Sequence, residues 1–230
     1  QVMSTLDLIG VGTEYDFIRE MALERRGLQG RMVVNDQTGI SYPVYEVQDS
    51  PLVSIIIPSK DNVEILKQCI RSVYEHTTYP NYEIIVVDNG SSAQARMALQ
   101  NFQEECAFTY LYEPMDFNFS VMCNLGAKKA GGEYLLLLND DMEVLADCAD
   151  WLDRMVGQAS LRHVGAVGAK LLYPNSTLIQ HAGVTNTISG PGHKLKGLDD
   201  TQSYYYGRNK LVYDMIGVTA ACLLIRTKVY

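Results

Sequence analysis

Residues 134–143 of the chain, YLLLLNDDME, join an unbroken apolar run to an abrupt acidic end. Five apolar residues without alternation are typical of a strand that is buried on both faces of a sheet. An ionised carboxylate that is buried without a partner costs much free energy, so we expect Asp140 and Asp141 just beyond the carboxyl end of this strand. Ligands bind at that edge of open α/β sheets, and two adjacent carboxylates there favour a divalent cation that carries a phosphorylated ligand.

The sequence from residue 51 onward alternates between apolar runs and helical stripes of apolar residues. The predicted strands are 52–58, 82–92, 108–113 and 134–138, and the predicted helices between them are 62–76, 95–105 and 118–132. This order with short links predicts an α/β fold, a mainly parallel sheet with helices on both faces. Beyond it we expect a helix at 151–159, a strand at 164–173, a long polar loop over 174–214, and an apolar strand-like run at 215–226.

The first 50 residues have a different pattern, which predicts a small N-terminal extension. Residues 13–27 predict a helix that Thr13 caps and Gly27 ends. Residues 31–47 predict a β-hairpin, and the QDSP segment at 48–51 predicts a linker. We therefore expect an extension over 1–50 and an α/β domain over 51–230. The chain starts at Gln1 without a Met and stops at Tyr230 inside an apolar run, so we expect a fragment that is truncated at its C-terminus.

Composition narrows the classes of function. The net charge of −8 argues against a protein whose main task is to bind nucleic acid, although a metal can reverse the local sign for a phosphorylated ligand. No apolar run approaches the roughly 20 residues that span a bilayer, and no signal segment starts the chain. The five cysteines are odd in number and form no C-x-x-C pair, which favours reduced thiols in a cytoplasmic protein.

Polar side chains follow three of the predicted strands. In chain order these are Ser59, Lys60 and Asp61; Asp88 and Asn89; and Asn139, Asp140 and Asp141. The carboxyl ends of parallel strands meet at one edge, so we expect these groups to converge. Taken alone, Asp61 or Asp88 is more often the cap of the helix that follows the strand. The alternative interpretation of Asn139-Asp140-Asp141 is a polar turn. No G-x-G-x-x-G and no G-x-x-x-x-G-K-[ST] motif is present, which leaves a diphosphate held by a metal.

Three segments in the same order resemble family 2 glycosyltransferases with the GT-A fold: VSIIIPSKDN, YEIIVVDNGSS and NLGAKKAGGEYLLLLNDD. The resemblance covers residues 51–230. The segments at 117–127, 167–184 and 218–226 resemble the large bacterial enzymes that build cell-surface polysaccharides, including rhamnosyltransferase-like members. The helix and hairpin at 13–47 also resemble the segment that precedes the transferase domain in those proteins.

The resemblance implies a nucleobase pocket at the first two strand ends. Pro58 and Lys60 would border this pocket, and Asp61 would lie close by. Asp88 would accept a hydrogen bond from the uracil ring nitrogen, with Asn89 beside it.

The resemblance also implies a D-x-D-type motif at Asn139-Asp140-Asp141. Asp140 would hold the ribose or nucleotide side of the donor, and Asp141 would coordinate Mn²⁺ or Mg²⁺. The first position of the motif is Asn, which departs from the family pattern and weakens Asn139 as a ligand. Asn118 lies where relatives often carry a residue that contacts the base. His193, in a flexible loop, is a candidate for a diphosphate or metal contact.

The sequence gives weaker indications of the roles of His181 and of the catalytic base. We expect His181, in a Q-H-A-G context, to be a packed core histidine rather than an active-site residue. In relatives the base is acidic and follows the segment matching 218–226, so we expect it beyond Tyr230 and expect the fragment to bind donor and metal without it. Asp199, Asp200 and Asp214 are weaker candidates.

The family reaction is an inverting transfer of a sugar from a nucleotide-diphosphate donor, by default a UDP-sugar or else a dTDP-sugar, to a saccharide or lipid-linked saccharide acceptor. The full-length parent would lie in the cytoplasm or at the inner face of the membrane as a peripheral protein. Two alternatives stay open. One is a sugar-phosphate nucleotidyltransferase, although PSKDN lacks the Gly-rich basic loop of that class. The other is a non-catalytic module that binds a nucleotide-sugar.

Overall fold

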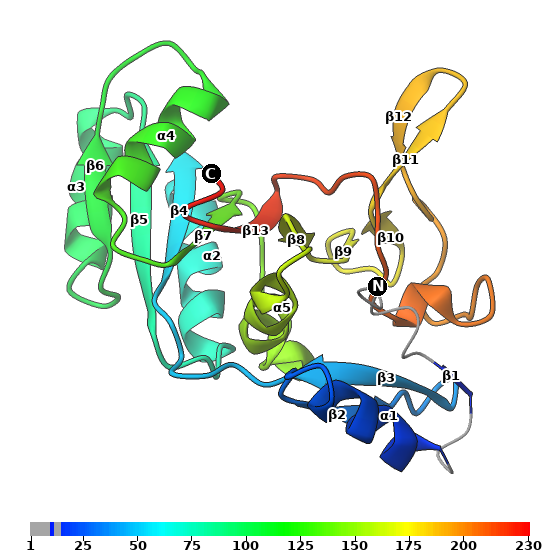
Figure 1. Ribbon diagram of the computed structural model, residues 1–230. Helices are drawn as coiled ribbons and strands as arrows, with labels where there is room; N and C mark the ends of the chain where they lie inside the picture. Colours follow the sequence, from blue (N-terminus) through cyan, green and yellow to red (C-terminus); the bar gives the residue numbers. More distant parts are fainter. Residues whose placement is uncertain (1–9, 12–14) are drawn as a thin grey trace. The chain divides into compact units, whose positions relative to one another are not determined.

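The computed structural model describes residues 10–11 and 15–230 (Figure 1). The chain divides into two compact units. The first, here called the sheet unit, consists of Gln48–Val167 and Ala220–Tyr230, and the second, the hairpin unit, consists of Gln1–Val47 and Gly168–Thr219. One break lies beside the predicted boundary near residue 50. The other breaks set residues 168–219 apart from the rest of the predicted domain over 51–230.

A six-stranded sheet forms the centre of the sheet unit. Its strands, in spatial order, are β6 (Thr109–Tyr112), β5 (Tyr82–Asp88), β4 (Val53–Ser59), β7 (Tyr134–Leu138), β13 (Cys222–Arg226) and β8 (Ala166–Gly168). The pairs β4–β5, β4–β7 and β5–β6 are parallel, and β13 runs antiparallel to β7. All residues of β4 and β7 are buried, as unbroken apolar runs require. The predicted mainly parallel sheet is therefore confirmed.

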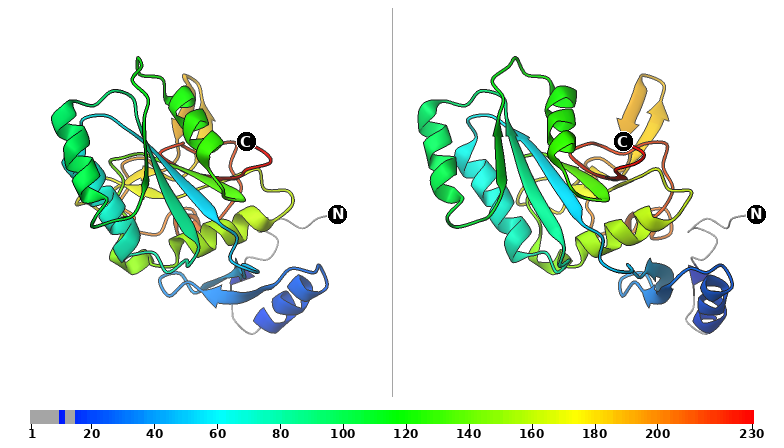
Figure 2. Two further views of the ribbon diagram at one scale, coloured as in Figure 1. Left: turned by 90° about the vertical axis from the view of Figure 1, so that its left-hand side faces the viewer. Right: turned by 60° about the vertical axis from the view of Figure 1, so that its left-hand side comes forward.

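Helices cover both faces of this sheet. They are α2 (Val63–Glu75), α3 (Ala93–Phe102), α4 (Phe119–Lys129) and α5 (Trp151–Ser160), with a short 3₁₀ helix at Ala146–Cys148. Figure 2 shows α2 and α3 on one side of the strands and α4 on the other. The four predicted helices are confirmed to within a few residues at their ends. In the part of the chain that the structure describes, no helix has the length and apolarity to cross a membrane.

The packing of α4 against the sheet fixes the strands that carry the acidic ends. One core cluster joins three strands to this helix: Ile56, Ile85, Val87, Met122, Cys123, Leu135 and Leu137. Gly126 permits the close approach, because a Cβ at this position would lie 2.4 Å from Cγ2 of Ile56 and 3.3 Å from Cγ2 of Val87. Each apolar side chain that is fully buried here contributes roughly 1.5–3 kcal/mol. The strand ends are thus held by a dense apolar core.

The N-terminal part of the hairpin unit is a helix on a small sheet. The helix α1 (Asp16–Glu24) accompanies β1 (Gly10–Val11), β2 (Gly30–Val34) and β3 (Ile40–Tyr45), which form an antiparallel sheet in the order β1-β3-β2. The predicted hairpin is confirmed, with Val34 opposite Ser41. Its turn is held by Asn35, whose Oδ1 accepts hydrogen bonds from the backbone N–H groups of residues 37 and 38. The predicted Thr13 cap lies outside the described residues.

Residues 168–219 contain more regular structure than the predicted long loop. They form β9 (Leu171–Leu172), β10 (Ile179–His181), the hairpin β11 (Val184–Thr187) and β12 (Gly190–His193), and a 3₁₀ helix at Arg208–Lys210. The predicted strand at 164–173 is wrong in extent, because β8 and β9 belong to different sheets. The predicted apolar strand at 215–226 shrinks to its last five residues, β13. The hairpin of β11 and β12 consists mostly of polar residues and glycine. Its sequence therefore lacks the apolar alternation that predicts a strand.

Candidate functional site

The carboxyl ends of β4, β5 and β7 lie next to one another in the order β5-β4-β7. Ser59, the last residue of β4, is opposite Asp88, the last residue of β5. The buried strand β7 stops at Leu138, and the acidic pair Asp140 and Asp141 follows it at once, partly or fully exposed. The prediction that both carboxylates lie just beyond a buried strand is confirmed. The sheet therefore gathers the predicted polar groups of three strands at one edge.

Asp140 is held in place from β4 and from the start of α2. Its Oδ2 accepts a hydrogen bond from Ser59 Oγ at 2.7 Å and another from Asn62 Nδ2 at 3.2 Å. Asn62 occupies the N-cap position of α2 but makes no side-chain capping bond there. The sequence did not reveal this role, because an asparagine before a helix is normally interpreted as a cap. Both donors are uncharged groups that bind the same oxygen, so they fix the orientation of the carboxylate.

Asp141 is exposed, and within the described residues no side chain forms an ion pair or hydrogen bond with its carboxylate. The neighbouring Asn139 is fixed through its backbone, since its N–H donates to the carbonyl of Ala221 at 3.0 Å. Its own carbonyl accepts a weak hydrogen bond from Cys69 Sγ at 3.7 Å. Asn139 thus anchors the turn, and Asp141 is left facing solvent.

Cys69 lies beneath the acidic turn and remains a neutral thiol. Burial, and after it the charge of Asp140, raises the pKa of Cys69 to about 12. A thiolate is the form that attacks electrophiles or binds metals. Cys69 therefore packs under the site without taking part in its chemistry.

The two carboxylates fit a magnesium or manganese ion. Hard divalent cations prefer carboxylate oxygens, and Mg²⁺ is commonly bound by one or two carboxylates with the remaining ligands from phosphate and water. Among the residues that the structure describes, no cluster of three or more histidine, cysteine, aspartate or glutamate side chains is arranged for a metal. Asp141, without a partner in that part of the chain, and Asp140, with Oδ2 oriented by Ser59, therefore suit a cation that brings its own phosphate ligands.

The loops after β4 and β5 are joined by a reciprocal pair of hydrogen bonds. The N–H of Asp61 donates to Ser91 Oγ at 2.8 Å, and the N–H of Ser92 donates to Asp61 Oδ1 at 2.9 Å. The bond from Ser92 also keeps the pKa of the Asp61 carboxyl below its ordinary value. Asp61 has a φ of 56°, a conformation that non-glycine residues adopt at a cost. The link joins the two loops to which the family resemblance assigns nucleobase binding.

Asp88 is almost fully buried, with 1% of its surface exposed. Its Oδ1 accepts hydrogen bonds from the N–H groups of Gly90 at 2.9 Å and Ser91 at 2.8 Å, and its Oδ2 accepts one from the Tyr110 hydroxyl. Burial raises the pKa of Tyr110, which therefore acts here as a donor. Asp88 organises the loop after β5, and its direct contact with a nucleobase stays a prediction.

Asn89 carries an unsatisfied acceptor at the same edge. The residue is 2% exposed, and its Nδ2 donates to the carbonyl of Met115 at 3.1 Å. Its Oδ1 is buried and has no hydrogen-bond partner within the described part of the chain. A buried acceptor without a donor costs free energy in the folded chain.

The other predicted donor-site residues differ in their settings. Lys60 is exposed, whereas Pro58 is buried within β4 beyond the part of that strand that pairs with β7. Asn118 is exposed and caps α4, since its Oδ1 accepts a hydrogen bond from the N–H of Val121 at 3.1 Å. The predicted ligand contacts of these three residues stay predictions.

The two histidines of the Q-H-A-G and S-G-P-G-H segments meet within the hairpin unit. Nδ1 of His181 lies 2.8 Å from Nδ1 of His193. His181 is completely buried, as predicted for a packed core histidine, and burial lowers its pKa to about 4. His193 is exposed at the end of β12. The predicted contact of His193 with a diphosphate or a metal stays a prediction.

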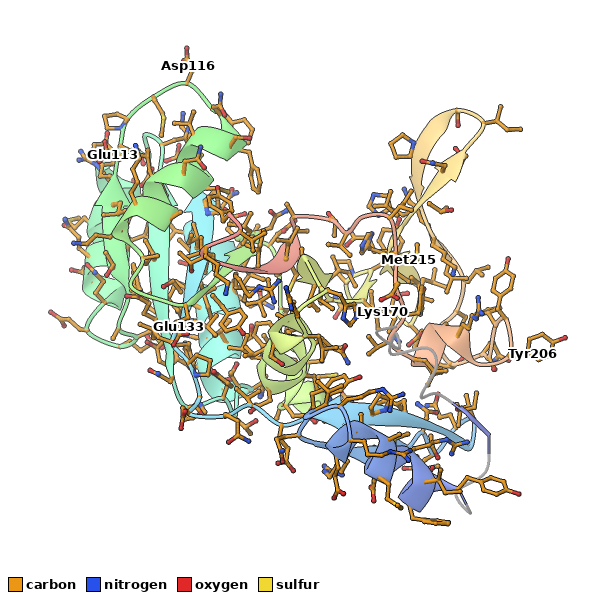
Figure 3. The ribbon with its side chains drawn as sticks, in the orientation of Figure 1. Glu113, Asp116, Glu133, Lys170, Tyr206 and Met215 are labelled. Carbon is orange, nitrogen blue, oxygen red and sulfur yellow. The ribbon has the colours of Figure 1, made fainter. Side chains whose placement is uncertain are left out.

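Two of the three weaker base candidates, Asp199 and Asp200, have structural partners, whereas Asp214 is exposed. Asp200 forms ion pairs with Lys170 at 2.6 Å and Lys210 at 3.4 Å, and it accepts a hydrogen bond from the buried Asn209 (Lys170 is labelled in Figure 3). Asp199 accepts a hydrogen bond from the N–H of Thr201 at 3.0 Å. These bonds give both aspartates a role in holding the segment together.

The fold and the strand ends define an α/β protein whose polar side chains gather at the carboxyl edge of its sheet. The profile of the family Glycosyl transferase family 2 matches residues 54–229, and the chain belongs to this family. It is 38% identical over 200 residues to the O-antigen biosynthesis protein RfbC of Myxococcus xanthus, covering 86% of this chain and 16% of that protein. Its identity to the uncharacterized protein y4gI of Sinorhizobium fredii is also 38%, over 192 residues, covering 81% of this chain and 21% of that protein.

The chain thus spans less than a quarter of the length of either relative. Among solved structures, it is similar to the mannosyltransferase PcManGT from Pyrobaculum calidifontis in complex with GDP-Man and Mn²⁺. That similarity has a TM-score of 0.48 at 23% identity, and it covers 68% of this chain and 43% of the other. The predicted family and the mainly parallel α/β fold are confirmed.

Proposed function

We propose that this protein transfers a sugar from a nucleotide-diphosphate donor, a UDP- or dTDP-sugar, to a saccharide or lipid-linked saccharide acceptor in the synthesis of a cell-surface polysaccharide. The observation that carries the proposal is the acidic pair that follows β7, in which Asp140 is oriented by Ser59 and Asn62 while Asp141 is exposed. The name of the Myxococcus relative supports the polysaccharide context. Family membership supports a glycosyltransferase over the nucleotidyltransferase alternative.

The loops after β4 and β5 are proposed to hold the nucleoside. The reciprocal bonds between Asp61 and Ser91–Ser92 fix these loops before a ligand arrives, which reduces the ordering that binding must supply. Asn89 offers a buried acceptor that lacks a donor among the described residues, and an N–H of a nucleobase would satisfy it. Lys60, exposed beside this edge, supplies positive charge.

The acidic turn is proposed to bind the donor diphosphate through a divalent cation, Mn²⁺ or Mg²⁺. Asp141 would be its main protein ligand and Asp140 would be either a second ligand or a ribose contact. A bound cation would neutralise charge on the leaving diphosphate. The residues of the chain contribute orientation, because Ser59 and Asn62 keep the Asp140 carboxylate in one rotamer.

Transfer is proposed to invert the anomeric centre in a single displacement, as the family resemblance implies. A general base near the acceptor hydroxyl is needed for that step. The lysine pairs of Asp200 and the backbone bond to Asp199 give these residues structural roles, so neither is proposed as the base. The donor half of the reaction is what the described residues support most directly.

A thermal-shift panel with UDP, dTDP, GDP and CDP, each with and without Mn²⁺, tests the donor site. A ligand that binds the folded state raises the melting temperature by mass action. We expect a shift with UDP or dTDP that requires Mn²⁺, and we expect Asp141→Ala to abolish it. Glu133→Ala is the matched control, because this exposed carboxylate directly precedes β7, at the opposite end of the strand from Asp141 (Figure 3).

The panel contradicts the proposal if no nucleotide shifts the melting temperature with Mn²⁺ present. If Glu133→Ala removes the shift as completely as Asp141→Ala does, the shift depends on the net charge of the protein rather than on the acidic turn. A shift that persists in Asp141→Ala would place metal binding elsewhere.

A further inference from the structure

The buried carboxylate of Asp88 is held by donors from two elements of the sheet unit. Its Oδ1 accepts the N–H groups of Gly90 at 2.9 Å and Ser91 at 2.8 Å, in the turn that follows β5. Its Oδ2 accepts the hydroxyl of Tyr110, which lies on the neighbouring strand β6. A carboxylate offers acceptor sites for about four hydrogen bonds, two on each oxygen. Three of these sites are engaged, so one remains, and it lies on Oδ2.

The register of the sheet explains why a tyrosine of β6 reaches this carboxylate. Tyr110 is paired with Val86, two residues before Asp88, in the parallel ladder of β5 and β6. Residues two apart on a strand lie on the same face, as do paired residues of neighbouring strands, so Tyr110 and Asp88 lie on one face. The N–H of Glu113, which is labelled in Figure 3, donates to the carbonyl of Asp88 at 2.8 Å and continues the ladder.

The surroundings of Tyr110 keep its hydroxyl protonated. Burial, and after it the hydrogen bond to Asp88, raises the pKa of Tyr110. The positive charge of Arg96 in α3 acts in the opposite direction, and the guanidinium carbon of Arg96 lies 4.2 Å from the ring centre of Tyr112. A neutral phenol has one proton to donate, and Oδ2 of Asp88 accepts it.

The same carboxylate holds the loops that are proposed to bind the nucleoside. The N–H groups of Gly90 and Ser91 bind Oδ1 of Asp88, and Ser91 Oγ accepts the N–H of Asp61 at 2.8 Å. A chain of hydrogen bonds therefore joins Tyr110 of β6 to the loops after β5 and β4. Oδ1 maintains the turn after β5, and Oδ2 is the oxygen with a free acceptor site.

We propose that Tyr110 is a positioning residue that leaves Asp88 a single acceptor site, on Oδ2, for the ring N–H of a nucleobase. The two residues then select uracil or thymine over cytosine, because the corresponding ring nitrogen carries a hydrogen in the first two bases and a lone pair in cytosine. A lone pair that faces the acceptor site is repelled. This role rests on the proposed function, in which the loops after β4 and β5 hold the nucleoside of the donor. The family resemblance implies the contact of Asp88 with the base, and the structure adds Tyr110 and the number of free acceptor sites.

Tyr110→Phe removes the hydroxyl and keeps the ring, so it tests the positioning role. With the hydroxyl gone, both acceptor sites of Oδ2 are free and neither direction is preferred. In calorimetric titration with Mn²⁺ present, UDP should bind about tenfold more weakly, as expected for a hydrogen bond to a charged group, and CDP binding should change by less than about twofold. Tyr112→Phe is the matched control, because it removes a hydroxyl from the same strand while the bond from Tyr110 to Asp88 remains.

The comparison of UDP with CDP separates positioning from a structural role. The two nucleotides share the ribose and the diphosphate and differ only in the base. A variant that loosens the loops weakens both nucleotides by the same factor, whereas a loss confined to UDP comes from the base. Equal weakening of UDP and CDP in Tyr110→Phe would make Tyr110 a purely structural residue and would refute the inference. Unchanged binding of UDP in this variant would refute it as well.

Asp88→Asn tests the free acceptor site by reversing its polarity. The amide oxygen has to stay where the N–H groups of Gly90 and Ser91 donate, so the NH₂ group takes the place of Oδ2. One hydrogen of this group faces the oxygen of Tyr110, and the other takes the place of the free acceptor site. We expect this variant to bind CDP more tightly than UDP, the reverse of the wild type. A variant that still prefers UDP would contradict the free site on Oδ2.

The hydrogen bond itself is measured without any ligand, by ¹³C NMR of protein labelled at tyrosine Cζ. The Tyr110 signal is the one that disappears in Tyr110→Phe. We expect this phenol to ionise only above the ordinary tyrosine pKa of 10.0, and to ionise at a lower pH in Asp88→Asn, where the charged acceptor is gone. A Tyr110 whose ionisation ignores Asp88→Asn would show that its hydroxyl does not donate to this carboxylate. If neither UDP nor CDP binds the wild type, the donor site and the base selection are both wrong, while this titration still decides the bond of Tyr110 to Asp88.

Discussion

The two compact units place their polar side chains in different ways. In the sheet unit, Asp140 and Asp141 stand where they do because a strand of buried leucines ends at Leu138. In the hairpin unit, His181, His193 and Asp200 are placed by bonds to other polar groups. The first arrangement depends on apolar burial, which leaves a pattern in the sequence, and the second on individual pairs, which do not.

This difference decides what each unit is sensitive to. Removing buried apolar surface should damage the sheet unit, whose strands β4 and β7 are buried throughout. A change of pH should damage the hairpin unit, because burial lowers the pKa of His181, one of its two paired histidines.

The largest effect is expected from a cavity in β7. Leu136 is fully buried in this strand, and Leu136→Ala removes packed methyl groups that the neighbours cannot replace. We expect the free energy of unfolding, measured with urea, to fall by about 3 kcal/mol. Met97→Ala in α3, where the side chain is 60% exposed, is the control and should change it by less than about 0.5 kcal/mol.

The same variants test the comparison of the units. Hydrogen exchange should accelerate at the amides of β4, β5 and β7 in Leu136→Ala, while amides of β11 and β12 change less. Equal acceleration in both units would show that the chain unfolds as one cooperative body and that the two units do not differ in stability.

The next effect is expected from pH, and it concerns the hairpin unit. Burial lowers the pKa of His181 from its ordinary value of 6.5 to about 4. Below pH 6.5 the unfolded chain binds a proton at this histidine that the folded chain refuses, so stability falls as the pH drops from 6.5 to about 4. The full loss is on the order of 3 kcal/mol, of which about half should be present at pH 5.

Urea unfolding at pH 7 and pH 5 of the wild type and of His181→Asn measures this loss. Asparagine does not titrate, so the wild type should lose more stability than the variant between the two pH values. His76→Asn, at a partly exposed histidine of the sheet unit, is the control. An equal pH dependence in wild type and His181→Asn would show that the buried imidazole can bind a proton in the folded state, against its contacts with Thr219 and His193.

The sequence predicted the sheet unit well, because burial on both faces produces unbroken apolar runs that end sharply. The three buried strands β4, β5 and β7 and the convergence of Ser59 and Asp88 followed from those runs. Parallel strands also need crossover connections between them, and the sequence shows these as helical segments with apolar residues along one face. The strand ends were therefore predictable as a group before any contact was known.

The sequence predicted neither the partners of the acidic turn nor the hairpin β11–β12. Asn62 is interpreted as a cap from its position, and only the structure shows its side chain on Asp140. The hairpin pairs Thr185 with Gly192 and Asn186 with Pro191, so it buries too few apolar residues to create alternation. The meeting of His181 and His193 depends on that hairpin and was hidden with it.

The smallest effect concerns Asn118, where a cap and a proposed ligand contact fall on one residue. Its Oδ1 caps α4 through the N–H of Val121, so Asn118→Ala should lower the free energy of unfolding by about 1 kcal/mol. Serine also caps helices, so Asn118→Ser should restore stability to within about 0.5 kcal/mol of the wild type. Ser92→Ala is the control, since it removes the corresponding cap of α3 without touching Asn118.

With stability restored, Asn118→Ser isolates the ligand contact. A serine hydroxyl is too short to reach a base that asparagine contacts, so UDP binding with Mn²⁺ should weaken by less than about tenfold, as expected for one neutral hydrogen bond. Calorimetric titration of wild type and Asn118→Ser measures this loss, because the serine variant keeps the helix cap. Unchanged binding in Asn118→Ser would leave the residue as a cap alone, and the donor site would then be confined to the strand ends of β4, β5 and β7.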